Sequence, residues 1–174
     1  MLKGYEMLNM DKQIVQPNKY IELKIRDLGF NGEGVGEYEG YTVFVPFALP
    51  NEIVKAKVLH VKKNLVYANL VEVLTKSNDR IEVECNRFTK CGGCDLLHLN
   101  YKKQLEYKKQ MLKNTLSKMI GEVKVNEVVA SKENIRYRNK IQIPFGKNEN
   151  GVILGFYKPK THSIASITKV LFAR

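Results

Sequence analysis

Short runs in which apolar and polar residues alternate constrain the fold of this 174-residue chain more than any other feature. In the first run, Ile21, Leu23 and Ile25 alternate with charged residues, which is the period of a strand with one buried face. The four such runs are residues 21–25, 41–47, 53–61 and 65–74. Because turn-forming residues separate them at short intervals, they predict a small β-barrel over residues 19–76.

A glycine motif, Gly32-x-Gly34-x-Gly36, lies between the first two runs. Glycine loops that bind nucleotides need a strand before them and a helix after them, so that the ligand meets the helix N-terminus. Here residues 37–43 have the composition of a turn and a strand. We therefore interpret the glycines as a tight β connection that uses positive φ, and we assign no cofactor-binding residue.

The rest of the chain divides into a tail, a linker and a second unit. Residues 1–18 lack periodicity and predict a flexible tail. Residues 75–80 are polar and predict a linker, after which residues 81–174 form the second unit.

The second unit has the pattern of an α+β domain. Asn100 is a suitable N-cap for a helix that ends at Gly121 and carries its apolar residues on one face. That apolar face consists of Tyr101, Leu105, Leu112, Leu116 and Met119. Further β-like runs are residues 123–129, 137–144, 152–157 and 164–167, with a hairpin-type turn at 147–151.

All of the excess positive charge lies in the part of the second unit that begins at Cys85. Residues 85–174 hold eighteen basic and six acidic side chains, a net charge of +12, whereas the whole chain has a net charge of +11. A positive field of this size attracts polyanions, of which nucleic acid is the commonest inside cells. The charge distribution therefore favours a nucleic-acid partner over a role in solubility alone.

Three cysteines, Cys85, Cys91 and Cys94, form the array C-x5-C-G-G-C. Thiols this close in an intracellular protein are more often a metal or redox site than a disulfide framework. An iron–sulfur cluster, a zinc ion and unliganded thiols are the three alternatives. Either metal lacks a fourth cysteine in this sequence.

None of the three histidines is assigned a ligand role. His98 follows Cys94 by four residues and could complete a zinc site, but an ordinary polar residue before the helix is the favoured interpretation. His60 lies in a predicted strand without a second ligand nearby, which favours a structural role. His162 lies in a predicted loop, and its spacing alone assigns no function.

Parts of the barrel sequence carry a family resemblance. Residues 32–36, together with 42–46 (TVFVP) and 48–52 (ALPNE), resemble the TRAM domain, a small RNA-binding barrel related to the OB-fold. This resemblance implies a five-stranded barrel and RNA as its partner.

The second unit resembles another part of the same proteins. The cysteine array with the residues up to Leu99, followed by YKKQL at 101–105, looks like the cluster segment of the RNA uridine C5-methyltransferases. Residues 137–140 (YRNK), 155–157 (GFY) and His162 continue the pattern. The resemblance implies a 4Fe-4S cluster held by the three cysteines, S-adenosylmethionine as methyl donor, and ribosomal RNA in preference to transfer RNA.

The sequence departs from that family in two respects. The family's S-adenosylmethionine-binding domain, with its cysteine nucleophile, has no counterpart among these residues, so we expect an N-terminal fragment that has no catalytic residue and is inactive alone. The family's fourth cluster ligand follows a His-x-Ile-x-x-Ile run by about three residues, where this chain has Val170. The cluster is therefore absent, labile or completed by an outside ligand.

RNA contacts in the second unit are expected from basic side chains that bind phosphates and from tyrosines that stack on unpaired bases. A role in the core or on a solvated surface remains the alternative for each residue. The candidates are Lys102, Lys109, Arg136, Tyr137, Arg138, Lys140 and Tyr157.

These observations predict the RNA-recognition part of an S-adenosylmethionine-dependent RNA (uracil-5-)-methyltransferase. A freestanding RNA-binding module with a structural metal is the alternative. A third hypothesis, a small electron carrier, leaves the positive charge of the second unit unexplained. The chain has neither an apolar stretch of membrane-spanning length nor a signal-peptide core at its start, so we expect a cytoplasmic monomer without a membrane partner.

Overall fold

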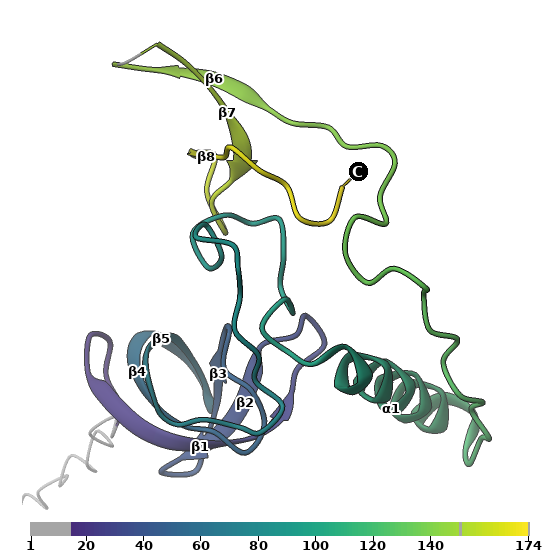
Figure 1. Cartoon of the computed structure of the whole chain (residues 1–174). Helices are drawn as coiled ribbons and strands as arrows, with labels where there is room; N and C mark the ends of the chain where they lie inside the picture. The colour runs from purple at the N-terminus through teal and green to yellow at the C-terminus, as the bar shows by residue number, and fades with distance from the viewer. Residues whose placement is uncertain (1–14, 150, 174) are drawn as a thin grey trace, which may run out of the picture.

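Five strands form a closed barrel in the computed structural model, which describes residues 15–149 and 151–173 (Figure 1). The strands are β1 (Tyr20–Leu28), β2 (Gly34–Tyr38), β3 (Tyr41–Val45), β4 (Ile53–Lys62) and β5 (Leu65–Thr75). They pair in the order β1-β2-β3-β5-β4, and only the β3–β5 pair is parallel. The predicted five-stranded, OB-like barrel is therefore confirmed.

The residues that alternate in the sequence point alternately into and out of this barrel. Ile21, Leu23 and Ile25 are buried in β1, and Val54 and Val58 are buried in β4. Their polar neighbours face outward, as strand geometry requires.

The strand β2 is the one that the sequence pattern missed, because its glycines resemble a turn. Gly34 and Gly36 lie within β2, and of the motif only Gly32 has a positive φ, of 82°. A Cβ on Gly36 would lie 2.6 Å from the carbonyl oxygen of Lys24, and one on Gly34 would lie 2.8 Å from that of Ala48. The interpretation as a positive-φ connection is thus wrong for Gly34 and Gly36, where glycine permits close backbone approach in the closed barrel.

The barrel core includes residues before the first strand. Val15 is fully buried in the core, and the backbone N–H of Asn18 donates to Val58 O at 2.8 Å. Of the predicted tail over residues 1–18, residues 1–14 lie outside the described residues, and residues 15–18 pack on the barrel.

A buried ion pair joins the barrel to the segment that follows it. Glu52 is fully buried, and its carboxylate accepts from Arg80 Nε at 2.5 Å and from Arg80 Nη2 at 2.8 Å. Backbone N–H groups of Leu49 and Ser77 also donate to this carboxylate, and Arg80 donates to Phe47 O. Burial raises the pKa of Glu52, but these partners outweigh burial and the pKa is lowered overall.

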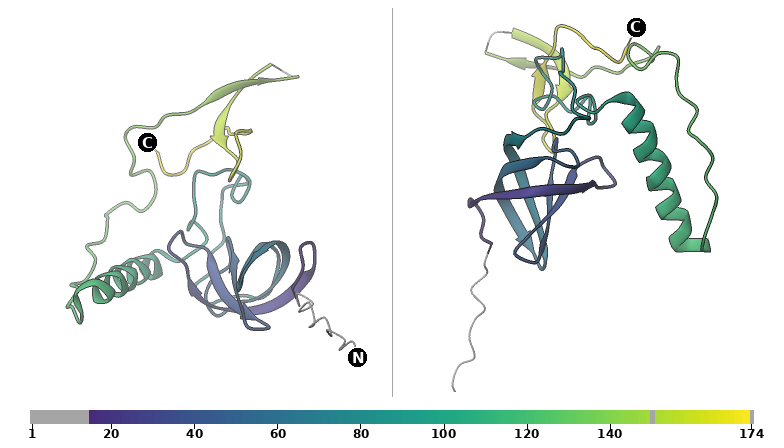
Figure 2. Two further views of the ribbon diagram at one scale, coloured as in Figure 1. Left: turned by 180° about the vertical axis from the view of Figure 1, so that it is seen from behind. Right: turned by 60° about the horizontal axis from the view of Figure 1, so that its bottom comes forward.

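The second unit consists of one helix and a small sheet. The elements are α1 (Tyr101–Ile120), β6 (Phe145–Asn148), β7 (Gly151–Tyr157) and β8 (Ile164–Ser166). The sheet has the order β6-β7-β8 and is antiparallel. The far end of α1 stands clear of the barrel and of the small sheet (Figure 2).

The helix begins and ends as predicted, whereas two of the predicted strands are absent. The Asn100 side chain caps α1 by accepting from the backbone N–H of Lys102, and Gly121 ends it with a φ of 81°. Residues 123–129 and 137–144 run back from α1 to the small sheet and are not strands (Figure 1). Arg138 forms only an isolated parallel bridge, with Ala173. Predicted strands over those residues are therefore wrong.

The apolar face predicted for α1 is not buried. No residue of α1 is buried, and Leu112 and Met119 are exposed. The helix meets the barrel instead through Tyr107, which packs beside Leu28 and Leu49 and donates its hydroxyl hydrogen to Gly29 O. Within the described residues, no helix is long and apolar enough to cross a membrane.

The Glu52–Arg80 pair predicts a large loss of stability on truncation. We expect Arg80→Ala to lower the free energy of unfolding by about 3–5 kcal/mol, because it leaves a buried carboxylate without its cation. Arg26→Ala is the matched control, since it removes an exposed pair with Glu37 and should cost below about 1 kcal/mol. Denaturant unfolding of both variants measures the difference, and equal losses would contradict the role of the buried pair.

Candidate nucleic-acid interface

The cysteine segment (residues 85–94) is attached to the small sheet through its two glycines. The N–H of Gly92 donates to Tyr157 O at 2.9 Å, and a Cβ on Gly92 would lie 2.8 Å from that oxygen. A Cβ on Gly93 would lie 3.2 Å from the Phe172 ring and 3.4 Å from Cys91 Sγ. The glycines therefore allow the thiol-bearing backbone to lie against the end of β7.

The charges of the other two cysteines affect the titration of Cys94. Burial, followed by the charges of Cys85, Cys91 and Asp95, raises the pKa of Cys94 to about 11, against a smaller opposing effect of Arg138. Across residues 15–149 and 151–173, no three His, Cys, Asp or Glu side chains lie close enough together to hold a metal ion.

The predicted 4Fe-4S cluster therefore does not fit the donor set as it is arranged here. Val170, at the position of the expected fourth ligand, is half-buried and has no donor atom. None of the three cysteines forms a disulfide.

Tyr137 and Arg138 lie beside the cysteine segment, as one side of a cavity of about 490 Å³ that Cys94 and Lys108 also line. The Arg138 guanidinium lies 4.7 Å from the centroid of the Phe172 ring, a cation–π contact. The backbone N–H of Arg138 donates to Phe172 O at 2.9 Å. These contacts fix Arg138, an exposed cation, beside the exposed ring of Tyr137 in the lining of one cavity.

The other predicted RNA-binding residues do not line this cavity. Lys140 lines a shallower hollow together with Arg138, and the Arg136 backbone N–H donates to Leu171 O. Tyr157 is exposed, with its ring 6.2 Å from that of His162. On α1, Lys102 is exposed and Lys109 forms an ion pair with Glu127. Arg138 thus lines one cavity with Tyr137 and another with Lys140, and neither cavity is lined by Lys102 or Lys109.

His98 is a core residue in the structure. Its ring is fully buried, 5.1 Å from the Phe88 ring, and neither ring nitrogen has a hydrogen-bond partner among the described residues. Burial, and then the charge of Arg80, lowers the pKa of His98 to about 4, so the ring is neutral near pH 7.

A set of aromatic residues on the outside of the barrel was missed by sequence reasoning. Phe44 on β3, Tyr67 on β5 and His60 on β4 form an aromatic ladder, with centroids 5.3 Å apart for Phe44–Tyr67 and 4.5 Å apart for His60–Tyr67. Each of these three residues points outward from its strand, and that outward position is the only feature of the ladder that the sequence predicts. Their alignment depends on strand pairing that the sequence does not state.

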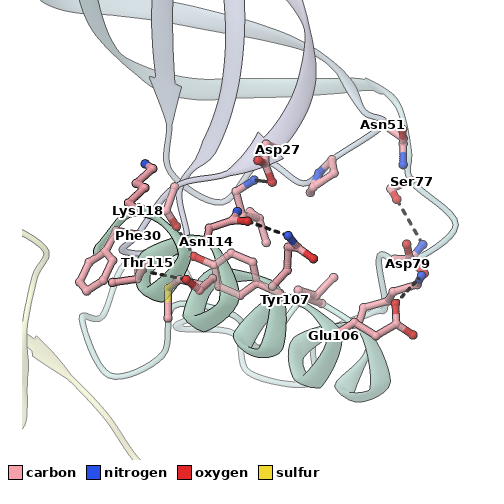
Figure 3. Close-up of a pocket in the computed structure, with 17 residues that line it drawn as sticks. Asp27, Phe30, Asn51, Ser77, Asp79, Glu106, Tyr107, Asn114, Thr115 and Lys118 are labelled. Atoms are coloured by element: carbon pink, nitrogen blue, oxygen red, sulfur yellow. Dashed lines mark hydrogen bonds and ion pairs between the residues drawn. The ribbon is translucent and has the colours of Figure 1, made fainter. Parts of the chain in front are cut away.

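A cavity of about 500 Å³ lies between α1 and the barrel (Figure 3). Tyr107 points from α1 towards the barrel here, beside Phe30 and Asp27. Asp79 and Glu106 add further negative charge, and Glu106 is paired with Lys103. This mixed lining suits helix–barrel packing and does not favour a polyanion.

Comparison with protein families places a TRAM domain at residues 15–71. The matched range covers the barrel from its first buried residue to within β5. The domain predicted from the glycine motif and the two neighbouring segments is thus confirmed.

Comparison with curated proteins extends the similarity to the second unit. The chain is 40% identical over 160 residues to an uncharacterised RNA methyltransferase of Clostridium tetani, covering 91% of this chain and 35% of that protein. It is 39% identical over 159 residues to one of Halalkalibacterium halodurans, covering 90% of this chain and 35% of that protein. The chain thus spans about a third of the length of the curated relatives that it matches.

A solved structure resembles the chain over both parts. The tRNA (uracil-54, C5)-methyltransferase of Pyrococcus abyssi, in complex with S-adenosyl-L-homocysteine, matches with a TM-score of 0.63 and 31% sequence identity. The match covers 88% of this chain and 33% of that chain.

The buried His98 predicts a pH-dependent stability. Its pKa of about 4 lies below the ordinary value of 6.5, so the unfolded chain binds the proton first as the pH falls. The neutral ring's contribution to the free energy of unfolding is fully present above pH 6.5 and is lost as the pH falls towards 4. Its size is on the order of 3 kcal/mol. We expect His98→Phe to remove this loss in urea unfolding at a series of pH values. His162→Gln, at an exposed position, should leave the profile unchanged, and an unchanged profile in His98→Phe would contradict the assignment.

The missing donor at Val170 predicts poor cluster retention. Following the family resemblance, we expect the 174-residue chain purified without oxygen to retain iron and sulfide well below one cluster per chain. Val170→Cys should raise both contents after anaerobic reconstitution, whereas Val170→Ala should not. A full cluster in the unaltered chain would show that its own three thiols suffice.

Proposed function

Because the chain carries a TRAM domain and is homologous to bacterial RNA methyltransferases, we propose that it is the RNA-binding and substrate-recognition part of an RNA (uracil-5-)-methyltransferase. The observation that carries this proposal is the extent of the similarity. It covers about 90% of the chain, so it includes the second unit as well as the barrel. Both parts are therefore expected to serve the same reaction.

The uracil C5 specificity is supported by the Pyrococcus structure, whose protein methylates that atom in transfer RNA. The bound S-adenosyl-L-homocysteine in that structure supports S-adenosylmethionine as the methyl donor. We assign no catalytic residue and no methyl-donor site to these 174 residues, and we expect them to be inactive alone. Their role is to bind and orient the RNA, in the cytoplasm and as a monomer.

Recognition of RNA by the second unit rests on charge and on exposed aromatic rings. The net charge of +12 over residues 85–174 attracts the phosphate backbone without regard to sequence. Tyr137 and Arg138 lie together at the mouth of the cavity near Cys94, where a ring contacts a base and a guanidinium contacts a phosphate. Lys140 adds a second cation beside Arg138.

We further propose that the RNA is ribosomal rather than transfer RNA. The resemblance of the cysteine segment favours ribosomal RNA, whereas the Pyrococcus protein acts on transfer RNA. Competition between ribosomal RNA fragments and transfer RNA for the purified chain distinguishes them, and we expect ribosomal RNA to bind more tightly.

RNA binding should weaken steeply as salt rises, because neutralised phosphates release counterions. We expect the double variant Arg138→Gln, Lys140→Gln to lower affinity and to reduce the slope of log affinity against log salt by about 0.7 for each phosphate of a single-stranded RNA that it no longer neutralises. Arg26→Gln, a cation on the barrel already paired with Glu37, is the matched control and should leave the slope unchanged. Filter binding at several salt concentrations measures the slope, and a flat response in the unaltered chain would refute the proposal.

A further inference from the structure

We propose that a cavity between the barrel and the second unit, with Phe44 and Tyr67 of the aromatic ladder as its aromatic wall, binds one unpaired base of the RNA. The inference rests on the proposed function, because it assumes that RNA is the ligand, and it adds a specific site on the barrel. The cavity has a volume of about 320 Å³, within the range of about 300–1,000 Å³ typical of small-ligand sites.

Two rings of the aromatic ladder, Phe44 and Tyr67, line this cavity, and His60 stacks on Tyr67 outside the cavity lining. Phe44, Tyr67 and His60 lie directly opposite one another across β3, β5 and β4, with interplanar angles of 22° for Phe44–Tyr67 and 17° for His60–Tyr67. The register of β4 shifts between Val58 and His60, which leaves both Leu59 and His60 exposed. A bulge of this kind re-aims a side chain, and here it brings the His60 ring alongside Tyr67.

Residues distant in sequence close the cavity around this wall. Phe44, Leu59 and Tyr67 line it from the strands, and Asn31 lines it from the connection between β1 and β2. The opposite side comes from the second unit, where Gly92, Pro159 and Lys160 line the cavity. Because Gly92 is hydrogen-bonded to the end of β7, the cysteine segment and the loop after β7 approach the barrel as one piece.

The polar lining suits a neutral base better than a phosphate. Two carboxylates, Glu33 and Asp95, face a single lysine, Lys160, so a phosphate inside the cavity would be repelled. The amide side chains of Asn31 and Asn69 offer both donors and acceptors, which are the groups that match the edges of an unpaired base. The cavity thus combines aromatic contact with polar groups at its edge.

Cations that would hold the neighbouring phosphates are exposed on the barrel and on the second unit. Lys62 and Lys63 are exposed at the turn that joins β4 to β5, two and three residues beyond His60. Lys160 is exposed at the opposite side. A single strand whose base enters the cavity therefore meets positive charge on both sides of the ladder, whereas a base in a duplex is already stacked and paired.

The test uses the full 174-residue chain and a single-stranded RNA of about 10 nucleotides that carries one 2-aminopurine, whose fluorescence falls when an aromatic ring contacts it. We expect binding to quench the fluorescence, and Tyr67→Leu to abolish the quenching and lower affinity by about tenfold. The salt slope of binding should not change, because the Tyr67 side chain neutralises no phosphate. A duplex of the same sequence should show no quenching.

Two further variants keep the test decisive. His60→Ala removes the most exposed ring of the ladder, cannot disturb the core, and should weaken binding in the same direction. Tyr20→Leu is the matched control, since Tyr20 is another exposed ring on the outside of the barrel, beside Lys55 and Lys57, and should bind and quench as the unaltered chain does.

The outcomes separate this site from the proposed function. Salt-dependent RNA binding with full quenching in both Tyr67→Leu and His60→Ala would overturn the base site and leave the RNA-binding function standing. An equal loss in Tyr20→Leu would overturn the assignment to this cavity. Failure of the unaltered chain to bind RNA even at low salt would overturn both proposals.

Discussion

The buried ion pair between Glu52 and Arg80 is the interaction on which the arrangement of the two parts depends. A carboxylate without water is stable as an anion only with a cation and hydrogen-bond donors around it. Arg80 supplies the cation, and its contact with Phe47 O binds the same guanidinium to the barrel backbone. The chain must therefore leave the barrel in one direction, which sets where the cysteine segment begins.

Glycines at three positions also determine the arrangement, because there the backbone lies too close to another backbone segment to leave room for a Cβ atom. Gly34 and Gly36 allow β2 to lie against neighbouring backbone in the closed barrel, and Gly92 allows the cysteine segment to lie against the end of β7. Together with the ion pair, these contacts bring the second unit over the outer surface of the barrel. The cavity beside the aromatic ladder results from that placement and belongs to neither part alone.

Much of the barrel could be predicted from the sequence, because the period of two in β1 and β4 depends only on which residues can be buried. The α1 helix could also be predicted, because Asn100 and Gly121 mark its two ends through contacts with residues near them in the sequence. Residues 123–129 were misread because their apolar alternation has no partner strand in the described chain. A strand needs a neighbour for its hydrogen bonds, and local sequence does not report whether one is present.

The sequence by itself determined the barrel, the capped helix, the position of the charge and the TRAM-type motifs, all of which depend on local composition and spacing. Only the tertiary structure decided that Tyr137 and Arg138 share a cavity with Cys94, that His98 is a buried neutral ring, and that Phe44, Tyr67 and His60 align into a ladder. The physical reason is that strand register and close backbone approach bring together residues far apart in the chain. That such residues are close in space cannot be predicted from their spacing along the sequence.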